Sequence, residues 1–304
     1  MPRRAKPDPR LPSLALIGDA REAGLSGDQV RHRVRSGAWL RIGLGAYLPA
    51  GESTYDDLDP HARERVEHIH RAVAAAIRNS GTVVCDASAA LVHGLPVLDV
   101  PANVQLAVPP GRWSGSRGGV DFRVRAFLES EVDEGRVPVA SALRSWIDIT
   151  RYGSLAQALA CGDAGVRSSK FDVAAVMDDR ERWRGQRGCR RLLRAAELVD
   201  GARESVLESA SFAYFVERGI PLPRMQVELR SLLGAFIARV DFLWDDFLLV
   251  GEADGRLKYD DRESLYAEKR REDAIREAGY RVVRWGMGDL RSAALARRLR
   301  ALMH

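Results

Sequence analysis

Residues 236–255, FIARVDFLWDDFLLVGEADG, indicate the architecture of the C-terminal third of this 304-residue chain. Its two apolar runs, separated by Asp245 and Asp246, predict neighbouring strands joined by a tight turn. In the first run Asp241 is expected at the strand end, on the face opposite to the alternating apolar side chains. Those apolar residues, expected to share one face, are Phe236, Ala238, Val240 and Phe242.

Acidic side chains of this stretch are expected to converge. Glu252 and Asp254 are two residues apart on the second strand, so their carboxylates project from the same face, next to the strand that carries Asp241. A helical Glu204 or Glu208 can complete the cluster. Such carboxylates repel one another unless a cation compensates, and hard oxygen ligands suit Mg²⁺ or Mn²⁺. The pattern predicts a metal-dependent site for phosphodiester hydrolysis.

The elements around this stretch predict a C-terminal α/β domain over residues 201–304. A helix is expected from Ser205, a strand at 224–229, then the two strands above, a long polar helix and a last strand at 280–286. The resulting α-β-β-β-α-β order is informative, because it places the acidic residues on adjacent central strands.

The same residues resemble the PD-(D/E)XK nuclease superfamily, in its very-short-patch-repair-like branch, a bacterial domain of unknown function. The resemblance implies a restriction-endonuclease-like fold in which Asp241 and Glu252 bind the metal and Glu204 supports them from the helix. It also implies that Asp254 occupies the position of the superfamily's lysine. The matching positions are Glu204-Ser205, Gly219 to Pro223, Gln226, Val240-Asp241, Glu252 to Gly255 and Gly279 to Arg284.

The displaced lysine is the main departure from that pattern. With Asp254 at the lysine position, a catalytic cation must come from elsewhere, and Lys258 and Lys269 are the lysines nearby. Lys269 belongs to the following helix and Lys258 to the segment after Gly255. A rigid helix holds an ammonium group more steadily, so Lys269 is the favoured residue, although an ordinary solvated helix face also explains it.

Residues 1–52 predict a winged helix-turn-helix domain. A helix is expected at 13–23, and Ser26 with Gln29 forms a capping box for a second helix, stapled by Leu25 and Val30. The second helix exposes Arg31 and Arg35, and the following two-stranded wing carries Arg41. These three arginines are candidate contacts to DNA phosphates or bases, with a solvated surface as the alternative.

This segment resembles the N-terminal module of AbiEi-type antitoxins. The matching positions are Gly24, Leu25, Ser26, Gly37, Trp39, Arg41, Gly45 and Tyr47. The resemblance implies sequence-specific DNA binding, often at the protein's own promoter, and a nucleotidyltransferase-type toxin as a possible partner.

Residues 53–200 predict a central α+β scaffold domain, also similar to the middle of the AbiEi-like family. A helix is expected from Pro60, and its histidines, His61, His68 and His70, lie on different faces, which favours a solvated surface over a metal site. Ser88 and His93 form a conceivable nucleophilic pair, but no G-x-S-x-G turn surrounds the serine, so packing is favoured.

Composition limits the function classes. The chain is 46% hydrophobic and 29% charged, lacks an apolar run long enough for a membrane span, and is expected to be soluble and cytoplasmic. Its three cysteines have no metal-binding spacing.

The leading hypothesis for this α+β multidomain protein is a DNA-binding, Mg²⁺-dependent endonuclease. The alternative is a non-enzymatic type IV antitoxin and transcriptional autorepressor that uses a nuclease-like fold for binding.

Overall fold

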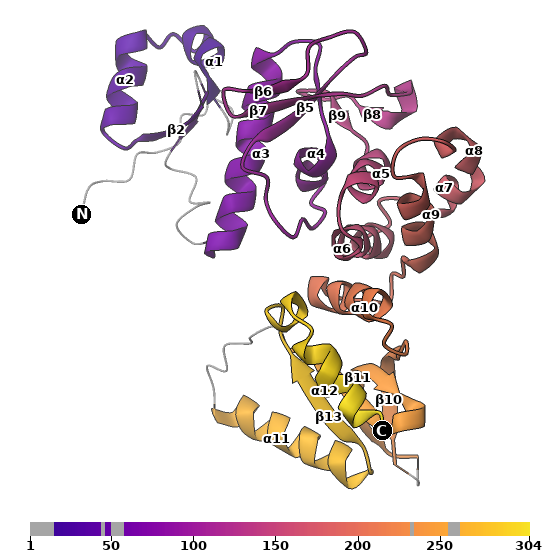
Figure 1. The fold of residues 1–304 in the computed structure, drawn as a ribbon. Helices are drawn as coiled ribbons and strands as arrows, with labels where there is room; N and C mark the ends of the chain where they lie inside the picture. The colour runs from indigo at the N-terminus through magenta and orange to yellow at the C-terminus, as the bar shows by residue number, and fades with distance from the viewer. Residues whose placement is uncertain (1–14, 44–45, 50–57, 232–233, 255–261) are drawn as a thin grey trace. The chain divides into compact units, whose positions relative to one another are not determined.

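The computed structural model describes residues 15–43, 46–49, 58–231, 234–254 and 262–304 (Figure 1). Within these ranges the chain is a mixed α/β protein with three separate β-sheets, in agreement with the predicted α+β class. It divides into two compact units, Met1–Ser145 and Trp146–His304. A membrane span requires about 18 or more apolar residues in succession, and none of the helices in the described ranges meets that requirement.

The first unit begins with two short helices and a small three-stranded sheet. Ser26 caps the second helix: its Oγ accepts from the Gln29 amide, and its own amide donates to Gln29 Oε1 at 2.7 Å, which confirms the capping box. Leu25 and Val30 pack together in the core of this module. The elements are β1 (Ala15–Leu16), α1 (Ile17–Glu22), α2 (Gly27–Arg35), β2 (Trp39–Gly43) and β3 (Ala46–Pro49).

The predicted first helix at 13–23 is shorter in the structure. Ala15 and Leu16 form β1, which pairs with β3 through Ala15 and Tyr47, so the sheet order is β1-β3-β2. The helix therefore starts at Ile17, because the residues before it supply backbone hydrogen bonds to the edge of the wing. The rest of the expected start, residues 13–14, lies outside the described ranges.

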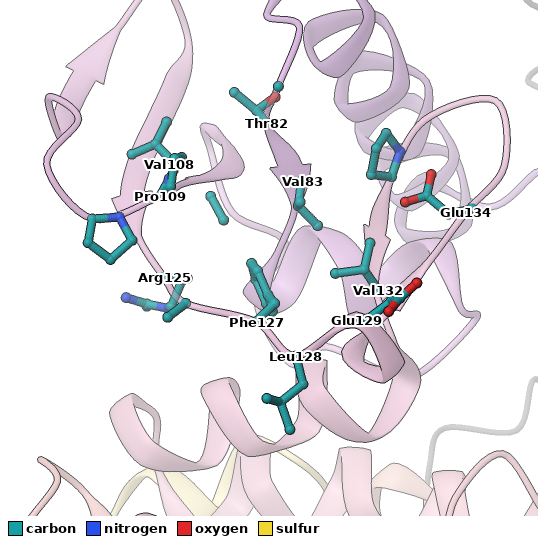
Figure 2. A pocket seen from close by; sticks show the side chains of 15 residues that line it. Thr82, Val83, Val108, Pro109, Arg125, Phe127, Leu128, Glu129, Val132 and Glu134 are labelled. Atoms are coloured by element: carbon teal, nitrogen blue, oxygen red, sulfur yellow. The ribbon is translucent and has the colours of Figure 1, made fainter.

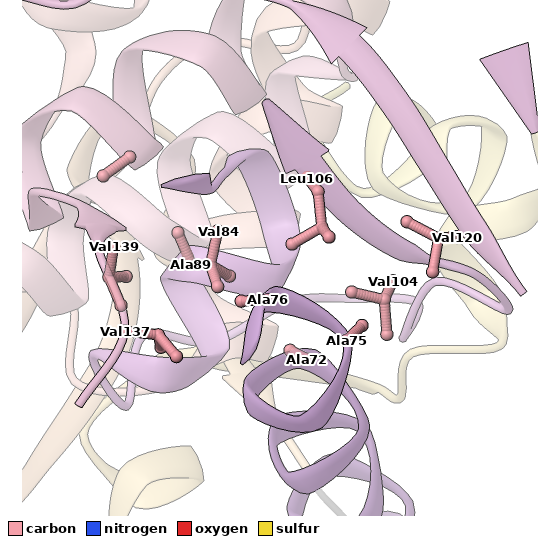
Figure 3. Close-up of a cluster of buried hydrophobic side chains, with 11 residues drawn as sticks. Ala72, Ala75, Ala76, Val84, Ala89, Val104, Leu106, Val120, Val137 and Val139 are labelled. Carbon is pink, nitrogen blue, oxygen red and sulfur yellow. The ribbon is translucent and has the colours of Figure 1, made fainter. Parts of the chain in front are cut away.

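The rest of the first unit is a six-stranded sheet packed against α3 and α4. Alanines at positions 72, 75 and 76 let α3 approach the sheet closely, and they pack with Val84 and Leu106 (Figure 3). The strand order is β6-β7-β5-β4-β9-β8. The elements are α3 (Pro60–Arg78), β4 (Val83–Val84), α4 (Asp86–Val92), β5 (Val104–Val108), β6 (Gly115–Arg117), β7 (Val120–Val124), β8 (Val132–Asp133) and β9 (Val139–Ala140).

The second unit joins a helical layer to the C-terminal sheet. Leu159 of α6 packs against Phe212 and Ala213 of α10, so residues 146–200 belong with the C-terminal sheet rather than with the rest of the predicted 53–200 domain. The buried Arg203–Asp163 ion pair, 2.6 Å between Nε and Oδ2, strengthens this connection. The helices are α5 (Ala142–Tyr152), which crosses the boundary between the units, α6 (Leu155–Arg167), α7 (Ala174–Asp178), α8 (Arg180–Trp183), α9 (Cys189–Leu198) and α10 (Val206–Arg218).

The C-terminal elements follow the predicted α-β-β-β-α-β order, with one more helix at the end. The sheet order is β10-β11-β12-β13, antiparallel except for the last pair, which is parallel. A tight turn at Asp245–Phe247 joins β11 to β12, as expected. The elements after α10 are β10 (Arg224–Arg230), β11 (Phe236–Trp244), β12 (Leu249–Ala253), α11 (Arg262–Glu277), β13 (Arg281–Trp285) and α12 (Ala294–Leu302).

The predicted alternation of apolar side chains along β11 is wrong at one point. Val240 packs in a cluster with Ile275 of α11, whereas Phe242 packs in a different cluster with Phe215 of α10. The interruption falls at Asp241. Opposite it, Gln226 adopts a left-handed φ of 50°, between residues that pair regularly with Val240 and Phe242. A side chain at φ > 0 is strained, so this backbone shape is imposed by the surrounding packing.

Candidate functional site

Three carboxylates meet where β11, β12 and α10 come together. Phe242 pairs with Gly251, so the adjacent residues Asp241 and Glu252 lie across from each other on neighbouring strands. Glu208 reaches the same place from α10 and is only 5% exposed. We refer to Glu208, Asp241 and Glu252 as the carboxylate cluster.

Gln226 connects two members of the cluster. Its Nε2 donates to Glu208 Oε2 at 2.7 Å and lies 3.4 Å from Asp241 Oδ1. Ser205 caps α10 by accepting from the Glu208 amide at 3.1 Å, which fixes the first turn of the helix and therefore the direction of the Glu208 side chain. The left-handed backbone at Gln226 thus places the Nε2 donor between the carboxylates of Glu208 and Asp241.

Asp241 is the electrostatically strained member. Burial raises the pKa of Asp241 to about 6, and the nearby carboxylates of Glu252 and Glu208 act in the same direction. Hydrogen bonds oppose this rise: the Ala253 amide donates to Oδ2 at 2.9 Å, and Gln226 approaches Oδ1. A pKa near neutrality is typical of functional carboxyls.

Arg271 of α11 supplies the cation of the site. Its guanidinium donates to both oxygens of Glu252, with 2.8 Å from Nη2 to Oε2 and 3.3 Å from Nη1 to Oε1. Nη1 also donates to the backbone carbonyl of Arg239 at 3.3 Å. Glu252 is only 9% exposed. A charge-assisted contact with two hydrogen bonds at such a site is stronger than an ordinary surface ion pair.

The structure brings together only part of the predicted set. Asp241 and Glu252 are neighbours, as expected, but Glu204 is not: it precedes the α10 cap, is half-exposed, and pairs with Arg239 at 2.5 Å. Glu208, the other acid considered, takes its place because it lies one turn inside the helix. Asp254 follows β12, is partly buried, and donates its backbone amide to the Trp285 carbonyl at 3.0 Å.

Neither candidate lysine is shown at the cluster. The side chain of Lys269 is exposed on α11, and Lys258 lies outside the described residues. Helical spacing identifies Arg271 instead, because it lies four residues before the buried Ile275 and hence on the same side of α11. The sequence analysis assigned no role at the site to Gln226 or to Arg271.

Asp241 and Glu252 are the residues that could hold a hard divalent ion, although Arg271 competes for the Glu252 carboxylate. Within the described ranges, no group of three or more His, Cys, Asp or Glu side chains is arranged to hold a metal ion. Asp241 and Glu252 nevertheless offer hard oxygens, and the like-charge repulsion that helps to raise the Asp241 pKa is what a dication would relieve. A metal would bind to Asp241 and either share Glu252 with Arg271 or displace the guanidinium.

The predicted DNA-binding arginines are all exposed in the winged module. Arg31 and Arg35 are four residues apart on α2 and therefore share one helix face, and Arg41 lies on β2 of the wing. Arg31 forms an ion pair with Asp28, whose side chain is also exposed. The Asp28 carboxylate would compete with a phosphate for Arg31.

Ser88 and His93 do not form the nucleophilic pair considered above. Ser88 shares a hydrogen bond of 2.7 Å with His68, and both are fully buried, whereas His93 Nε2 contacts the Ala140 carbonyl. The prediction that the α3 histidines are all solvated is wrong for His68, because it lies on the face of α3 that packs on α4. Burial lowers the pKa of His68 to about 4, so it is neutral and acts in packing.

A cavity of about 590 Å³ lies at one end of the six-stranded sheet (Figure 2). Its lining includes Val83, Val108, Phe127 and Leu128. The Arg125 guanidinium at its edge pairs with Asp86 at 3.1 Å. The lining is mostly apolar, with Thr82, Arg125, Glu129 and Glu134 as its polar side chains.

Known proteins provide distant relatives. No model of a known protein family matches the sequence. The chain is 25% identical over 267 residues to uncharacterized proteins of Mycobacterium tuberculosis, Rv2248 of strain H37Rv and MT2308 of strain CDC 1551, covering 86% of this chain and 91% of each relative. Among solved structures, the crystal structure of RV2827C protein from M. tuberculosis shares 17% identity and a TM-score of 0.32, over 66% of this chain and 71% of that one.

Proposed function

We propose that this chain binds DNA through its winged helix-turn-helix and hydrolyses phosphodiester bonds in its C-terminal unit with Mg²⁺ or Mn²⁺. The observation that carries the proposal is the convergence of Glu208, Asp241 and Glu252 at adjacent strands and a helix start. Burying carboxylates together costs free energy, and carboxyls perturbed in this way cluster at functional sites. The exposed arginines of α2 and β2 support DNA as the substrate class.

The residues of the cluster have distinct roles in this proposal. Asp241 and Glu252 would hold the ion, which when bound would polarise the phosphate and acidify a water molecule. Gln226 and the Ala253 amide hold Asp241 in one orientation, and Glu208 keeps Gln226 in place. Arg271 presents a guanidinium next to Glu252, where it can also stabilise negative charge on a phosphate oxygen.

Cleavage of plasmid and single-stranded DNA with Mg²⁺, Mn²⁺ or EDTA tests the proposal. We expect cleavage that requires metal and falls by roughly 100-fold or more in Asp241→Asn, since the metal site loses its central ligand. Asp246→Asn is the matched control, because it neutralises an exposed carboxylate in the turn after the same strand. Cleavage that survives both EDTA and Asp241→Asn, or a wild-type protein that never cleaves, contradicts the proposal.

The second candidate function is a repressor of the antitoxin type, with the nuclease-like fold used only for binding. The Arg271–Glu252 pair favours it, because it neutralises one carboxylate of the cluster without a metal. A repressor would bind its own promoter equally well in EDTA and in Mg²⁺ without cutting it. A nucleotidyltransferase-type toxin would be its partner, and its co-purification with this chain would support this candidate.

A further inference from the structure

An arginine-rich segment in the second unit is unrelated to the carboxylate cluster. Residues 180–194, RERWRGQRGCRRLLR, contain seven arginines and one glutamate, a net charge of +6, compared with +5 for the whole chain. The segment forms α8 and α9 and the turn between them. Its charge is therefore concentrated on two short, adjacent elements.

The fold holds this segment in a defined shape. Trp183 is buried, and the Arg151 guanidinium lies 5.4 Å from the centre of its ring. Gly188 starts α9 with φ of 80°, and a Cβ there would overlap the Arg151 carbonyl oxygen, so only glycine permits this approach. The arginines thus project from a frame that is anchored to α5.

The segment lines a cavity of about 850 Å³. Its polar lining includes Arg180, Arg184, Arg190, Arg191 and Gln186, with Glu181 as the acidic member. An open cavity of this size, lined by several guanidinium groups, suits an extended polyanion better than a single small anion.

Part of this positive charge is not balanced by carboxylates. Arg184 pairs with Glu181, Arg182 with Asp179, and Arg194 with Glu197. The other arginines have no carboxylate partner among the residues that the structure describes. These are Arg180, Arg187, Arg190 and Arg191.

The orientation of two of these four side chains is set by neutral groups. Arg191 Nη1 donates to the carbonyls of Arg151 and Gly153, at 3.3 and 2.9 Å, and Arg187 lies over the ring of Tyr152. Neither contact cancels the charge. Because such contacts fix the side chains in advance, less conformational entropy is lost when a ligand binds.

We propose that these four residues, the α8–α9 arginine cluster, bind the phosphodiester backbone of double-stranded DNA. Guanidinium groups match phosphate geometry, and a duplex presents phosphates at a spacing that several arginines can contact together. The choice of duplex DNA rests on the proposed function. The contact would be independent of base sequence and would add to the affinity of the winged module.

Salt-dependent DNA binding tests the cluster. Arg180→Gln/Arg190→Gln removes two exposed charges. Binding of a random-sequence duplex to the full chain is followed by fluorescence anisotropy between 50 and 200 mM salt. Over this interval the affinity of a protein that binds 6–10 phosphates falls by roughly 10³–10⁵. We expect a log-log slope lower by about 1.8, since each phosphate contact contributes about 0.9, and affinity reduced by roughly 10- to 60-fold near 0.1 M salt. The melting temperature should not change.

A matched control separates the cluster from net charge. Arg63→Gln/Arg230→Gln also removes two exposed arginines, but both already pair with glutamates, Glu67 and Glu228. We expect its slope to stay near that of the wild type. Equal effects in the two double variants, or an unchanged slope in Arg180→Gln/Arg190→Gln, would overturn the proposal. A larger loss for an RNA duplex of the same length would also overturn it, in favour of RNA.

The outcome is separable from that of the proposed nuclease function. A protein that never cleaves but loses slope in Arg180→Gln/Arg190→Gln supports the cluster and contradicts the nuclease. A protein that cleaves with metal but keeps its slope contradicts the cluster alone.

Discussion

Arg271 and Glu252 form a two-point ion pair between α11 and β12, with both carboxylate oxygens accepting from one guanidinium. The pair joins the helix to the sheet at the carboxylate cluster. It also determines how much negative charge is left there for a metal, because Glu252 is shared and Asp241 is not.

Arg271→Ala should reduce metal-dependent cleavage by roughly 100-fold, as loss of an electrostatic stabiliser does. Lys269→Ala should change the rate by less than about threefold, because that side chain is exposed on α11 and makes no contact with the cluster in the structure. Single-turnover rates on plasmid DNA, with circular dichroism to check folding, measure both effects.

Arg271→Lys provides a variant that keeps a positive charge next to Glu252. It should retain more activity than Arg271→Ala and fold normally, even though it cannot make the two-point contact. A strong loss in Lys269→Ala with a wild-type rate in Arg271→Ala would reverse the assignment of the cation.

Asp241→Asn should stabilise the metal-free protein at high pH. The pKa of Asp241 is raised to about 6 in the folded chain, from 3.8 as the ordinary value, so folding takes up a proton between these pH values. The stability that this group contributes is fully present below about pH 4 and is lost as pH rises through 6. Asparagine keeps an acceptor for the Ala253 amide and carries no charge.

We expect the free energy of unfolding in EDTA to be higher in Asp241→Asn by about 1–2 kcal/mol at pH 8, with no difference at pH 4. Urea titrations at the two pH values measure it, and Asp246→Asn serves as the exposed control. Adding Mn²⁺ should stabilise the wild type more than Asp241→Asn. A variant that is less stable than the wild type at pH 8 contradicts the electrostatic picture of the site.

Local signals were sufficient to predict much of this fold. The Ser26–Gln29 capping box, the glycine stops and the apolar periodicity act within one or two turns of chain, so α2, α3 and the C-terminal element order could be predicted correctly. β1 could not, because its two residues form a strand only by pairing with β3, about 30 positions away. The membership of residues 146–200 likewise depends on distant packing between α6 and α10.

The site was predicted to the level of its strands but not of its side chains. Adjacent strands placed Asp241 near Glu252, since strand pairing follows from the order of elements. The choice of Glu208 over Glu204 depends on where the α10 cap falls, and the Gln226 bridge depends on a left-handed φ at a non-glycine residue. Arg271 could have been predicted from the sequence, because its spacing of four residues from Ile275 places both side chains on the inner side of the helix.

Replacing Arg31, Arg35 and Arg41 together with glutamine should weaken DNA binding. Each phosphate that an arginine no longer neutralises lowers the log-log salt slope by about 0.9, so a slope reduced by up to about 2.7 is expected. Anisotropy titrations with a duplex from the protein's own promoter and with an unrelated duplex measure both affinity and sequence preference. An unchanged slope would place the DNA-binding surface of this module elsewhere.

Asp28→Asn should have the opposite effect. The Asp28 carboxylate pairs with Arg31 at an exposed site of α2, so in the proposed DNA complex it would compete with a phosphate and repel the DNA. We expect affinity to increase by roughly 3- to 10-fold at low salt, with a smaller gain at high salt because of screening. Glu217→Gln, an exposed acid on α10, is the control for net charge and should change affinity much less. Weaker binding by Asp28→Asn would show that α2 does not face DNA.

Asp163→Asn should destabilise the second unit strongly. Asp163 is fully buried and accepts from both Nε and Nη2 of Arg203, at 2.6 and 2.8 Å, and from the Asp200 amide. Removing the carboxylate leaves the buried guanidinium with only the half-exposed Asp200 carboxylate, 4.0 Å from Nη1, which costs about 3–5 kcal/mol. Glu197→Gln, which breaks the exposed pair with Arg194, should cost less than about 1 kcal/mol.

The double variant Asp163→Asn/Arg203→Met separates the charge from the packing. With both charges gone, methionine fills apolar space next to Phe212, whose ring already lies under the Arg203 guanidinium, so the double variant should unfold less readily than Asp163→Asn alone. Arg203 directly precedes Glu204 and the Ser205 cap that orients Glu208. Loss of the pair should therefore loosen the carboxylate cluster, and Mn²⁺ should stabilise Asp163→Asn less than it stabilises the wild type. Thermal unfolding of the wild type and these variants with and without Mn²⁺ measures this, and equal stabilisation in all of them would show that the cap is held without the buried pair.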